Sequence, residues 1–475
     1  MASAREINNG STLRVAVVGA GPSGFYATQA LFRADRPIQV DLFERLPSPF
    51  GLVRSGVAPD HPKLKRPIEL YQRIADTPDF TFVGNVCIGQ DLAVETLRQH
   101  YHAVIFANGS ESARPMGIPG ESLVGCHSAT AFVGWYNGHP DYRDEVIDVS
   151  CETAVVIGQG NVAVDVCRIL TKTVDELRHT DIAQHALDVL ADSRIREVHL
   201  IGRRGPLQAK FTHQELKELG VLEACTVEVD SEELLLNSAS ETELNDTNRP
   251  AQDKARNYKI LKRFAETSSR ARPRRCRLRF LLSPTALKGN KRLQQVVLEK
   301  NQLSGPAGKQ LAQGTGVLEK IDCGLLISSI GYRGSPISGL PFDRARGMIP
   351  NREGRIFKGD EPIAGLYTVG WIKRGPTGLI GTNKADAKET VNALLNDFSQ
   401  GTPSPRIGLE GLRPALSRLG IEVISYPTWQ RIDAQEIARG AAKTKPREKF
   451  TRVSEMLTLA RTGATANGHS LKPSR

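Results

Sequence analysis

A glycine-rich loop near the start of the chain has the residue types and spacing that bind a dinucleotide. Gly19-Ala20-Gly21-Pro22-Ser23-Gly24 fits the pattern G-x-G-x-x-G and follows a short β-branched run, residues 14–18. The first glycine permits a tight turn, the second lets backbone approach a pyrophosphate, and the third lets a helix pack on the strand. Glu44 lies at the end of the next expected strand, where a carboxylate accepts hydrogen bonds from ribose hydroxyls. This spacing predicts a dinucleotide site.

A second glycine-rich loop follows another buried-strand pattern, at residues 153–157. It reads Gly158-Gln159-Gly160-Asn161-Val162-Ala163, and the strand expected after it ends in Arg203-Arg204 rather than in an acid. A carboxylate would repel a 2′-phosphate, whereas guanidinium groups bind one through charge-assisted hydrogen bonds. One acidic and one basic unit in the same chain therefore predict FAD at the first loop and NADP(H) at the second. Flavin chemistry needs no protein nucleophile, because the cofactor performs it.

Each loop requires a buried strand before it and a helix after it. Helices are expected over residues 25–32 and from the second loop to about Thr171, and the expected strands are 14–18, 38–43, 83–86, 103–107, 153–157, 197–201, 324–328 and 366–369. These β-α-β units predict an α/β fold with two Rossmann-like, doubly wound nucleotide-binding domains. Because residues 366–369 resemble a closing strand of the first domain, the NADP domain (113–335) is expected to be inserted in a discontinuous FAD domain (1–112 and 336–475).

Three segments are expected to lack regular structure. Residues 47–62 (PSPFGLVRSGVAPDHP) are rich in Pro and Gly and are predicted to form a shaped loop. The polar tract 236–256 is interpreted as a surface insertion, and the charged segment 443–449 as a loop-like connector. The last dozen residues are expected to be frayed.

Composition limits the class of protein. The 475 residues carry 63 Lys plus Arg and 52 Asp plus Glu, a formal charge of +11, and 40% are hydrophobic. No apolar run approaches the roughly 20 residues that cross a bilayer, and residues 1–13 lack the features of a secretory or transit peptide, so we expect a cytoplasmic protein without membrane insertion. Seven scattered cysteines without a C-x-x-C pair argue against a disulfide framework, an iron–sulfur cluster or a zinc ribbon. The positive charge is compatible with nucleic acid, an anionic surface or an acidic protein partner. Aromatic residues are only 6% and no zinc-finger or RNP-like pattern occurs, so nucleic acid is the weaker choice.

The segment from Gly51 to Pro62 (GLVRSGVAPDHP), with Lys65, resembles a signature of the adrenodoxin reductases and their bacterial ferredoxin–NADP reductase relatives. Further similar segments are FVGWYNG (132–138), GQGNV (158–162), GRRGP (202–206), GWIKRGPTGLIG (370–381) and KPREK (445–449). The resemblance spans about residues 15–459. It implies hydride transfer from NADPH to FAD, then single-electron transfer to a ferredoxin- or adrenodoxin-type [2Fe-2S] protein that supplies oxidases such as cytochrome P450.

The resemblance also implies site residues. FAD would be bound by the first glycine loop and by further residues along the chain: Gly19, Gly21, Ser23, Gly24, Glu44, Leu52, Val86, Trp371, Gly378, Leu379 and Ile380. NADP would be bound by Gln159, Gly160, Asn161, Val162, Arg203, Arg204, Glu215 and Gly378. His61 and Glu218 are the candidate catalytic residues, with Asp165 a further candidate on the helix after the second loop.

An acidic iron–sulfur partner is expected to dock on basic residues of the NADP domain, which include the arginine-rich stretch 269–279 and Lys254, Arg256, Lys259, Lys262 and Arg263. We expect a monomer. Three alternatives to the reductase make different demands on the sequence. A disulfide reductase needs a redox-active cysteine pair, and none exists. A flavin-dependent NADPH monooxygenase also carries two glycine loops, but the His61 and Trp371 segments argue against it. A non-catalytic NADPH-binding protein would differ in having no flavin that NADPH bleaches.

Overall fold

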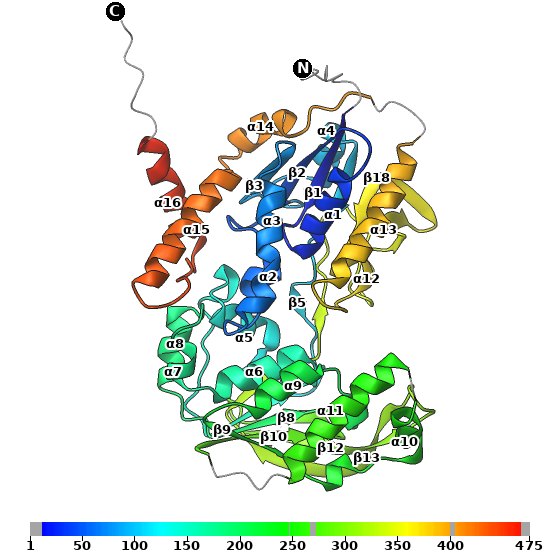
Figure 1. Cartoon of the computed structure of the whole chain (residues 1–475), viewed down its shortest axis with the longest axis vertical. Coiled ribbons are helices and arrows are strands. Elements are labelled where there is room, and N and C mark those ends of the chain that lie inside the picture. Colours follow the sequence, from blue (N-terminus) through cyan, green and yellow to red (C-terminus); the bar gives the residue numbers. More distant parts are fainter. Residues whose placement is uncertain (1–11, 247, 267–271, 400–403, 467–475) are drawn as a thin grey trace, which may run out of the picture.

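The computed structural model describes residues 12–246, 248–266, 272–399 and 404–466. Two sheets, one largely and one entirely parallel, form its framework and lie one above the other in Figure 1. Within the described residues, no helix is both long enough and apolar enough to pass through a bilayer.

The first sheet has the order β16-β17-β18-β4-β1-β2-β3. Its strands are β1 (Leu13–Val18), β2 (Ile38–Glu44), β3 (Phe80–Gly84), β4 (Ala103–Phe106), β16 (Asn351–Arg352), β17 (Arg355–Lys358) and β18 (Glu361–Thr368). β18, β4, β1, β2 and β3 run parallel, and β16 and β17 join as an antiparallel edge. The late strand β18 therefore lies beside β4, as the sequence predicts for a discontinuous domain.

Alternate residues of β1 enter different cores on the two faces of this sheet, as a strand's period of two requires. One face is covered by α1 (Pro22–Phe32), α3 (Pro67–Ala75), α13 (Thr382–Asp397) and α15 (Tyr426–Ala441). The other face is covered by α4 (Val94–His100) and α14 (Leu409–Arg418). α16 (Val453–Ala466) packs against α15.

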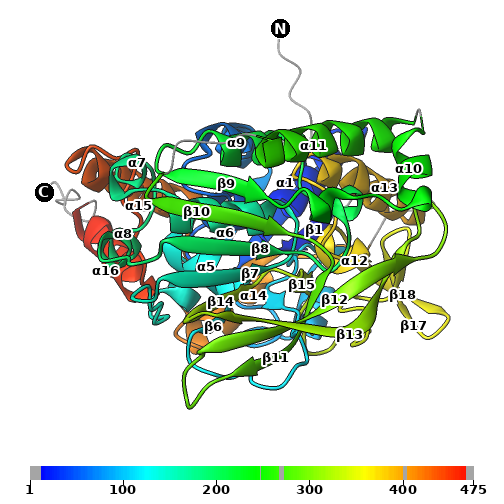
Figure 2. The same cartoon turned by 90° about the horizontal axis from the view of Figure 1, so that it is seen from below.

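The second sheet is parallel throughout, in the order β6-β14-β7-β8-β10-β9. Its strands are β6 (Cys126–Ser128), β7 (Thr153–Ile157), β8 (Glu197–Ile201), β9 (Cys225–Val229), β10 (Arg274–Arg279) and β14 (Leu325–Ser328). On one face lie α5 (Ala129–Tyr136), α6 (Asn161–Thr171), α8 (Gln184–Ala191), α9 (His213–Gly220) and α11 (Arg249–Glu266). The other face is covered by an antiparallel sheet of β11 (Leu282–Lys288), β12 (Gln295–Ser304) and β13 (Leu311–Asp322) (Figure 2).

The chain passes between the two halves twice. β5 (Ser112–Ala113) on the outward passage pairs antiparallel with β15 (Tyr332–Arg333) on the return. This two-stranded ladder joins the two connections side by side. The doubly wound α/β fold with one unit inserted in the other is thus the fold that the sequence predicts.

Two of the expected irregular segments contain helices. Within residues 47–62, which were expected to hold no regular element, α2 (Gly51–Ser55) forms a short helix entered through Phe50 at φ 84°. The turn formed by Phe50 and Gly51 lets a helix begin inside a Pro- and Gly-rich stretch. The polar tract 236–256 contains α10 (Ser238–Leu244) and the start of α11, a helix that packs on the second sheet through Ile260 and Leu261, beyond the tract.

The charged segment 443–449 has no helix or strand, as predicted, but it is not a solvated connector. Lys445, Glu448 and Lys449 are buried against the second half of the molecule. The Lys445 ammonium donates to the Ile182 carbonyl and to Glu448, at 2.5 Å each. Most of the last dozen residues, expected to be frayed, lie outside the described part of the chain.

Candidate active site

A single large cavity of about 1610 Å³ opens between the two sheets. It is lined by both glycine loops and by residues that follow the carboxyl ends of strands in both sheets. Ligands of open α/β sheets bind at that end. Most of the residues that the sequence predicts for FAD and NADP line this cavity; Gly24, His61 and Glu218 do not.

The first loop has the geometry its glycines predict. Gly19 has φ 112°, and a Cβ there would lie 2.6 Å from the Ala107 carbonyl oxygen. A Cβ at Gly24 would lie 2.0 Å from the Gly19 carbonyl oxygen, so only glycine lets α1 approach the loop. Gly21, the N-cap of α1, has open space where a Cβ would be and lines the cavity. The loop therefore presents bare backbone and a helix N-terminus to an anion.

Glu44 is held at the rim of this loop by backbone amides. Its Oε2 accepts from the Ala20 amide at 2.9 Å and its Oε1 from the Leu46 amide at 3.1 Å. Burial raises the pKa of this carboxyl, and the two amide bonds oppose that shift. Each carboxylate oxygen keeps a second lone pair, which is available to a ribose hydroxyl.

Two residues that sequence reasoning missed lie next to these. Asn108 Oδ1 and Ser110 Oγ are buried, line the cavity and have no hydrogen-bond partner. Both come directly after β4, and that position at a strand's carboxyl end was the signal that could have identified them.

The second loop repeats the first. Gly158 has φ 134°, and a Cβ there would lie 2.2 Å from the Ser329 carbonyl oxygen. Gly160 is the N-cap of α6 and has open space on its cavity side. α6 begins without an acidic residue in its first turn, so its amides face the cavity with no negative side chain in competition.

Arg203 and Arg204 lie beyond the end of β8 and line the same cavity. Arg203 is exposed, and Arg204 donates to the Gln208 carbonyl at 3.4 Å. Burial, and then repulsion by Arg203, lower the pKa of Arg204. Two adjacent guanidiniums that repel each other are suited to an anion placed between them.

Glu215, on α9, reaches the cavity from the opposite side of the loop. It is 9% exposed, and its Oε2 is buried without a hydrogen-bond partner. Ser328 Oγ, at the end of β14, also lines the cavity and is buried without a hydrogen-bond partner. Buried polar atoms without a hydrogen-bond partner destabilise the fold unless a ligand or a water molecule bonds to them.

His61 and Glu218 meet although they come from different halves of the molecule. His61 Nε2 and Glu218 Oε2 are 2.6 Å apart, and His61 Nδ1 lies 3.9 Å from Asp165 Oδ1. His61 is 9% exposed, and its Nδ1 has no hydrogen-bond partner. Burial raises the pKa of Asp165 to about 6. Of these three residues Asp165 lines the cavity, so it is the one through which the pair is connected to a ligand there.

Asp165 is itself held by Arg168, whose guanidinium donates to it at 2.9 Å and also pairs with Asp60. Lys172 lies 2.8 Å from the same Asp60 carboxylate. Asp60, which precedes His61 in the sequence, is therefore held by cations on and just after α6. This contact fixes the loop that carries His61 against the second half of the molecule.

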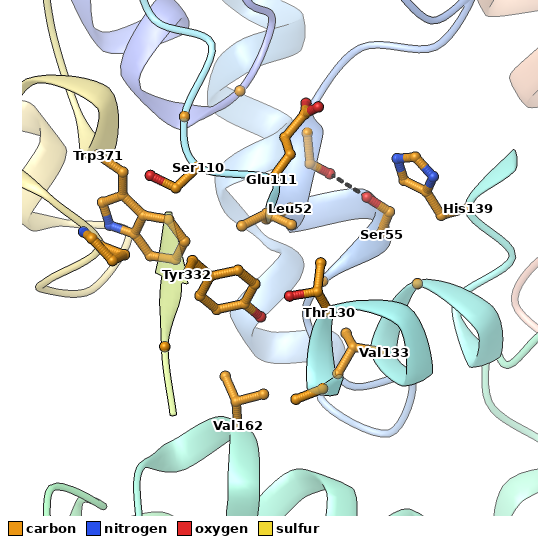
Figure 3. A pocket seen from close by; sticks show the side chains of 18 of the residues that line it. Leu52, Ser55, Ser110, Glu111, Thr130, Val133, His139, Val162, Tyr332 and Trp371 are labelled. Carbon is orange, nitrogen blue, oxygen red and sulfur yellow. Dashed lines mark hydrogen bonds between the residues drawn. The ribbon is translucent and has the colours of Figure 1, made fainter. Parts of the chain in front are cut away.

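Trp371 and residues 376–380 form the wall of the cavity shown in Figure 3, with Tyr332 beside Trp371. The two rings have centroids 5.4 Å apart, and Trp371 Nε1 donates to the Thr377 carbonyl at 3.2 Å. Gly378 has φ 84°, and a Cβ there would lie 2.4 Å from Thr382 Oγ1. The side chain of Leu379 is 64% exposed, so this wall presents both backbone and an apolar surface.

Comparison with known proteins gives the family. The model of the pyridine nucleotide-disulphide oxidoreductases matches residues 13–230. The chain is 43% identical to the mitochondrial NADPH:adrenodoxin oxidoreductase of Salvelinus fontinalis, over 95% of this chain and 92% of that protein. It is 42% identical to the NADPH-ferredoxin reductase FprA of Mycobacterium tuberculosis (strain ATCC 25618 / H37Rv), over 94% and 98%. This chain belongs to the adrenodoxin reductase family.

A solved structure of Mycobacterium tuberculosis FprA in complex with NADPH has the same fold, with a TM-score of 0.89 at 41% identity, and covers 95% of this chain and all of its own. The resemblance that the sequence shows to the adrenodoxin reductase family is thereby confirmed, as are the Rossmann-like fold and an FAD- and NADP-dependent oxidoreductase class.

The cavity of this adrenodoxin reductase family member fits both cofactors. The N-termini of α1 and α6 both face this cavity. Each follows a glycine loop whose first glycine has no room for a Cβ. Buried oxygens without partners lie on both sides of the cavity, at Asn108 and Ser110 in one half and at Glu215 and Ser328 in the other.

We predict that replacing both arginines, Arg203→Ala with Arg204→Ala, weakens NADPH binding far more than NADH binding. Each charge-assisted contact to a 2′-phosphate contributes about 1.5–3 kcal/mol, and NADH has no such phosphate. Steady-state KM values for the two nucleotides measure the difference. An equal loss for both would show that the arginines do not contact the 2′-phosphate.

Proposed function

We propose that this protein is an FAD-dependent ferredoxin–NADP reductase that takes electrons from NADPH and delivers them singly to an iron–sulfur protein. The observation that supports this most directly is the single cavity lined by both glycine loops, one with an acid at its rim and one with two arginines. Relatives at 42–43% identity are named as reductases, which favours this function over a flavin-dependent monooxygenase.

We assign the cofactors to the two halves as the sequence predicts. FAD binds to the first loop, with Glu44 on its ribose, and NADP binds to the second, with Arg203 and Arg204 on its 2′-phosphate. The FAD domain comprises residues 1–112 and 336–475, and the NADP domain residues 113–335. These boundaries agree with the sheets, since the strands of the first come from residues 13–106 and 351–368 and those of the second from 126–328.

FAD, when bound, supplies the redox chemistry, because it accepts a hydride from NADPH and releases electrons one at a time. The chain must then align the two rings and exclude water. Trp371, Tyr332 and the turn at Gly378 form one wall for this purpose. Glu215, whose free Oε2 faces the cavity from α9, is placed to accept a hydrogen bond from NADP.

His61 and Glu218 act beside this space. Their 2.6 Å hydrogen bond joins a loop of the FAD half to α9 of the NADP half, so it fixes the distance between the surfaces that bind the two rings. Hydride transfer needs no protein acid or base, so the role assigned to His61 is positioning. Asp165 links the pair to the cavity.

His61→Gln is expected to retain FAD and bind NADP nearly normally, but to slow reduction of the flavin by NADPH. Small displacements of reacting atoms cost up to about 10²-fold in rate. Stopped-flow bleaching of the flavin measures this step without ferredoxin. His213→Gln, the same substitution at a residue of α9 that does not line the cavity, is the control. An unchanged rate would reduce His61 to a structural loop residue, whereas loss of FAD would place its role in shaping the FAD loop.

For the iron–sulfur partner we propose an acidic [2Fe-2S] protein that docks on the exposed face of α11. Lys259 and Lys262 are exposed there, and α11 packs against α9, which carries Glu215 and Glu218. The arginines of β10 contribute less than the sequence suggests. Arg275 and Arg277 pair with Glu197, and Arg279 pairs with Glu233 and Glu319. The stretch 267–271 lies outside the described residues.

Reversing the charge of both lysines, Lys259→Glu with Lys262→Glu, is expected to raise the KM for ferredoxin about 3–10-fold at low salt, because exposed complementary charges contribute about 0.2–1 kcal/mol per pair. Flavin reduction by NADPH should be unchanged. Lys358→Glu, the same change on β17 of the other half, is the control. Ferredoxin-coupled turnover of the wild type should also fall with added salt. If it is independent of salt, docking through this face is wrong.

A cytoplasmic location and a monomeric state stay predictions. The relatives named from eukaryotes are mitochondrial, and the bacterial relatives are named without a compartment.

A further inference from the structure

The segment that follows β8 is fixed against the second glycine loop. The Lys210 amide donates to the Gln159 carbonyl at 2.7 Å, and the Thr212 amide donates to Asn161 Oδ1 at 2.8 Å. Both acceptors belong to the loop that caps α6. The backbone of Lys210 therefore lies beside the loop itself, six residues after the arginine pair at the end of the strand.

The side chain of Lys210 is exposed and lines the cavity. Within the described residues it forms no ion pair or hydrogen bond. Apart from Lys210, Arg203, Arg204 and Arg114, the cations that line the cavity are paired with acids. Arg54 pairs with Glu436, Arg45 pairs with Asp141, and the Lys449 ammonium lies 3.3 Å from Asp181. Lys210 thus offers a free positive charge that is tied by its backbone to the loop.

This charge is suited to a pyrophosphate, whose negative charge the glycine loop alone does not balance. A pyrophosphate carries two negative charges, whereas a helix N-terminus supplies the equivalent of about half a positive charge. α6 has no side-chain cap, and no acidic residue in its first turn neutralises that end. A flexible four-carbon side chain ending in an ammonium is a suitable point charge for a phosphate beside the loop.

We propose that Lys210 binds the pyrophosphate of NADP(H) and supplies the counter-charge at the second glycine loop. This inference rests on the proposed assignment of NADP to that loop. It assigns the 2′-phosphate and the pyrophosphate to different residues. Arg203 and Arg204 bind the 2′-phosphate, and Lys210 binds the bridge between the two ribose units. Lys210 would thereby set affinity for the dinucleotide without contributing to the choice of NADP over NAD.

Equilibrium binding to the FAD-loaded enzyme tests the assignment without turnover. Isothermal titration calorimetry with three probes separates the phosphates: NADP⁺, 2′-phospho-ADP-ribose, and 2′-AMP, which has the 2′-phosphate but no pyrophosphate. In Lys210→Met the Kd for the first two should rise about 3–10-fold, since a partly solvated charge-assisted contact contributes less than a buried one. The Kd for 2′-AMP should stay within about twofold of the wild type, and Lys210→Arg should restore most of the loss.

Lys217→Met is the matched control, because Lys217 is an exposed lysine of α9 that does not line the cavity. An unaltered flavin absorbance spectrum shows that each variant is folded. Equal weakening of 2′-AMP and NADP⁺ in Lys210→Met would move the contact to the 2′-phosphate and overturn the proposal. No change for any probe would make Lys210 a solvated residue, which also overturns it. If NADP⁺ itself fails to bind to the wild type, the proposed function fails instead.

Discussion

A buried charge cluster centred on Asp181 holds the two nucleotide-binding halves in register, and the active site depends on that register. Lys65, from the first half, lies 2.6 Å from the Asp181 carboxylate, and Lys449, from the C-terminal segment, lies 3.3 Å from it. The two ammonium groups lower the pKa of Asp181 to about 2 despite its burial, and burial lowers the pKa of Lys449 to about 7. Removing one partner of such a pair leaves an uncompensated buried charge, which costs about 3–5 kcal/mol. The cluster therefore specifies one arrangement of the halves rather than merely adding stability.

The same arrangement brings His61 to Glu218, because the Asp60–Arg168 pair beside it also joins the two halves. The two glycine loops belong to different halves of the molecule and line one cavity. Each half binds its own nucleotide, and the distance between the reacting rings is set by contacts such as these. Positioning of the rings is thus a property of the interface between the halves, and substitutions far from either cofactor can alter it.

Features that depend on residues close together in the chain could be predicted from the sequence. A β-branched strand, a glycine loop and a helix recur at fixed spacing, so both strand–loop–helix units followed from the residues, and their glycine loops, Glu44 and the arginine pair line one cavity. The closing strand β18 was found from its buried pattern. The sequence was insufficient where distant residues meet. The short helix α2 depends on a turn at Phe50 that Pro and Gly content hides. Burial of Lys445, Glu448 and Lys449 depends on partners near residues 181–184, and the free oxygens of Asn108 and Ser110 depend on which strand ends line one cavity.

The distribution of positive charge shows why composition alone does not locate a binding surface. The arginines of β10 stand out in the sequence, yet Glu197, Glu233 and Glu319 neutralise three of them, so they stabilise the second sheet rather than attract a partner. Two groups of cations without an acidic partner among the described residues lie at different places in the second half. Arg203, Arg204 and Lys210 face the cavity, whereas Lys259 and Lys262 are on the outer face of α11. The docking proposed for an acidic protein therefore uses residues other than those that line the nucleotide cavity, so binding of one partner need not displace the other.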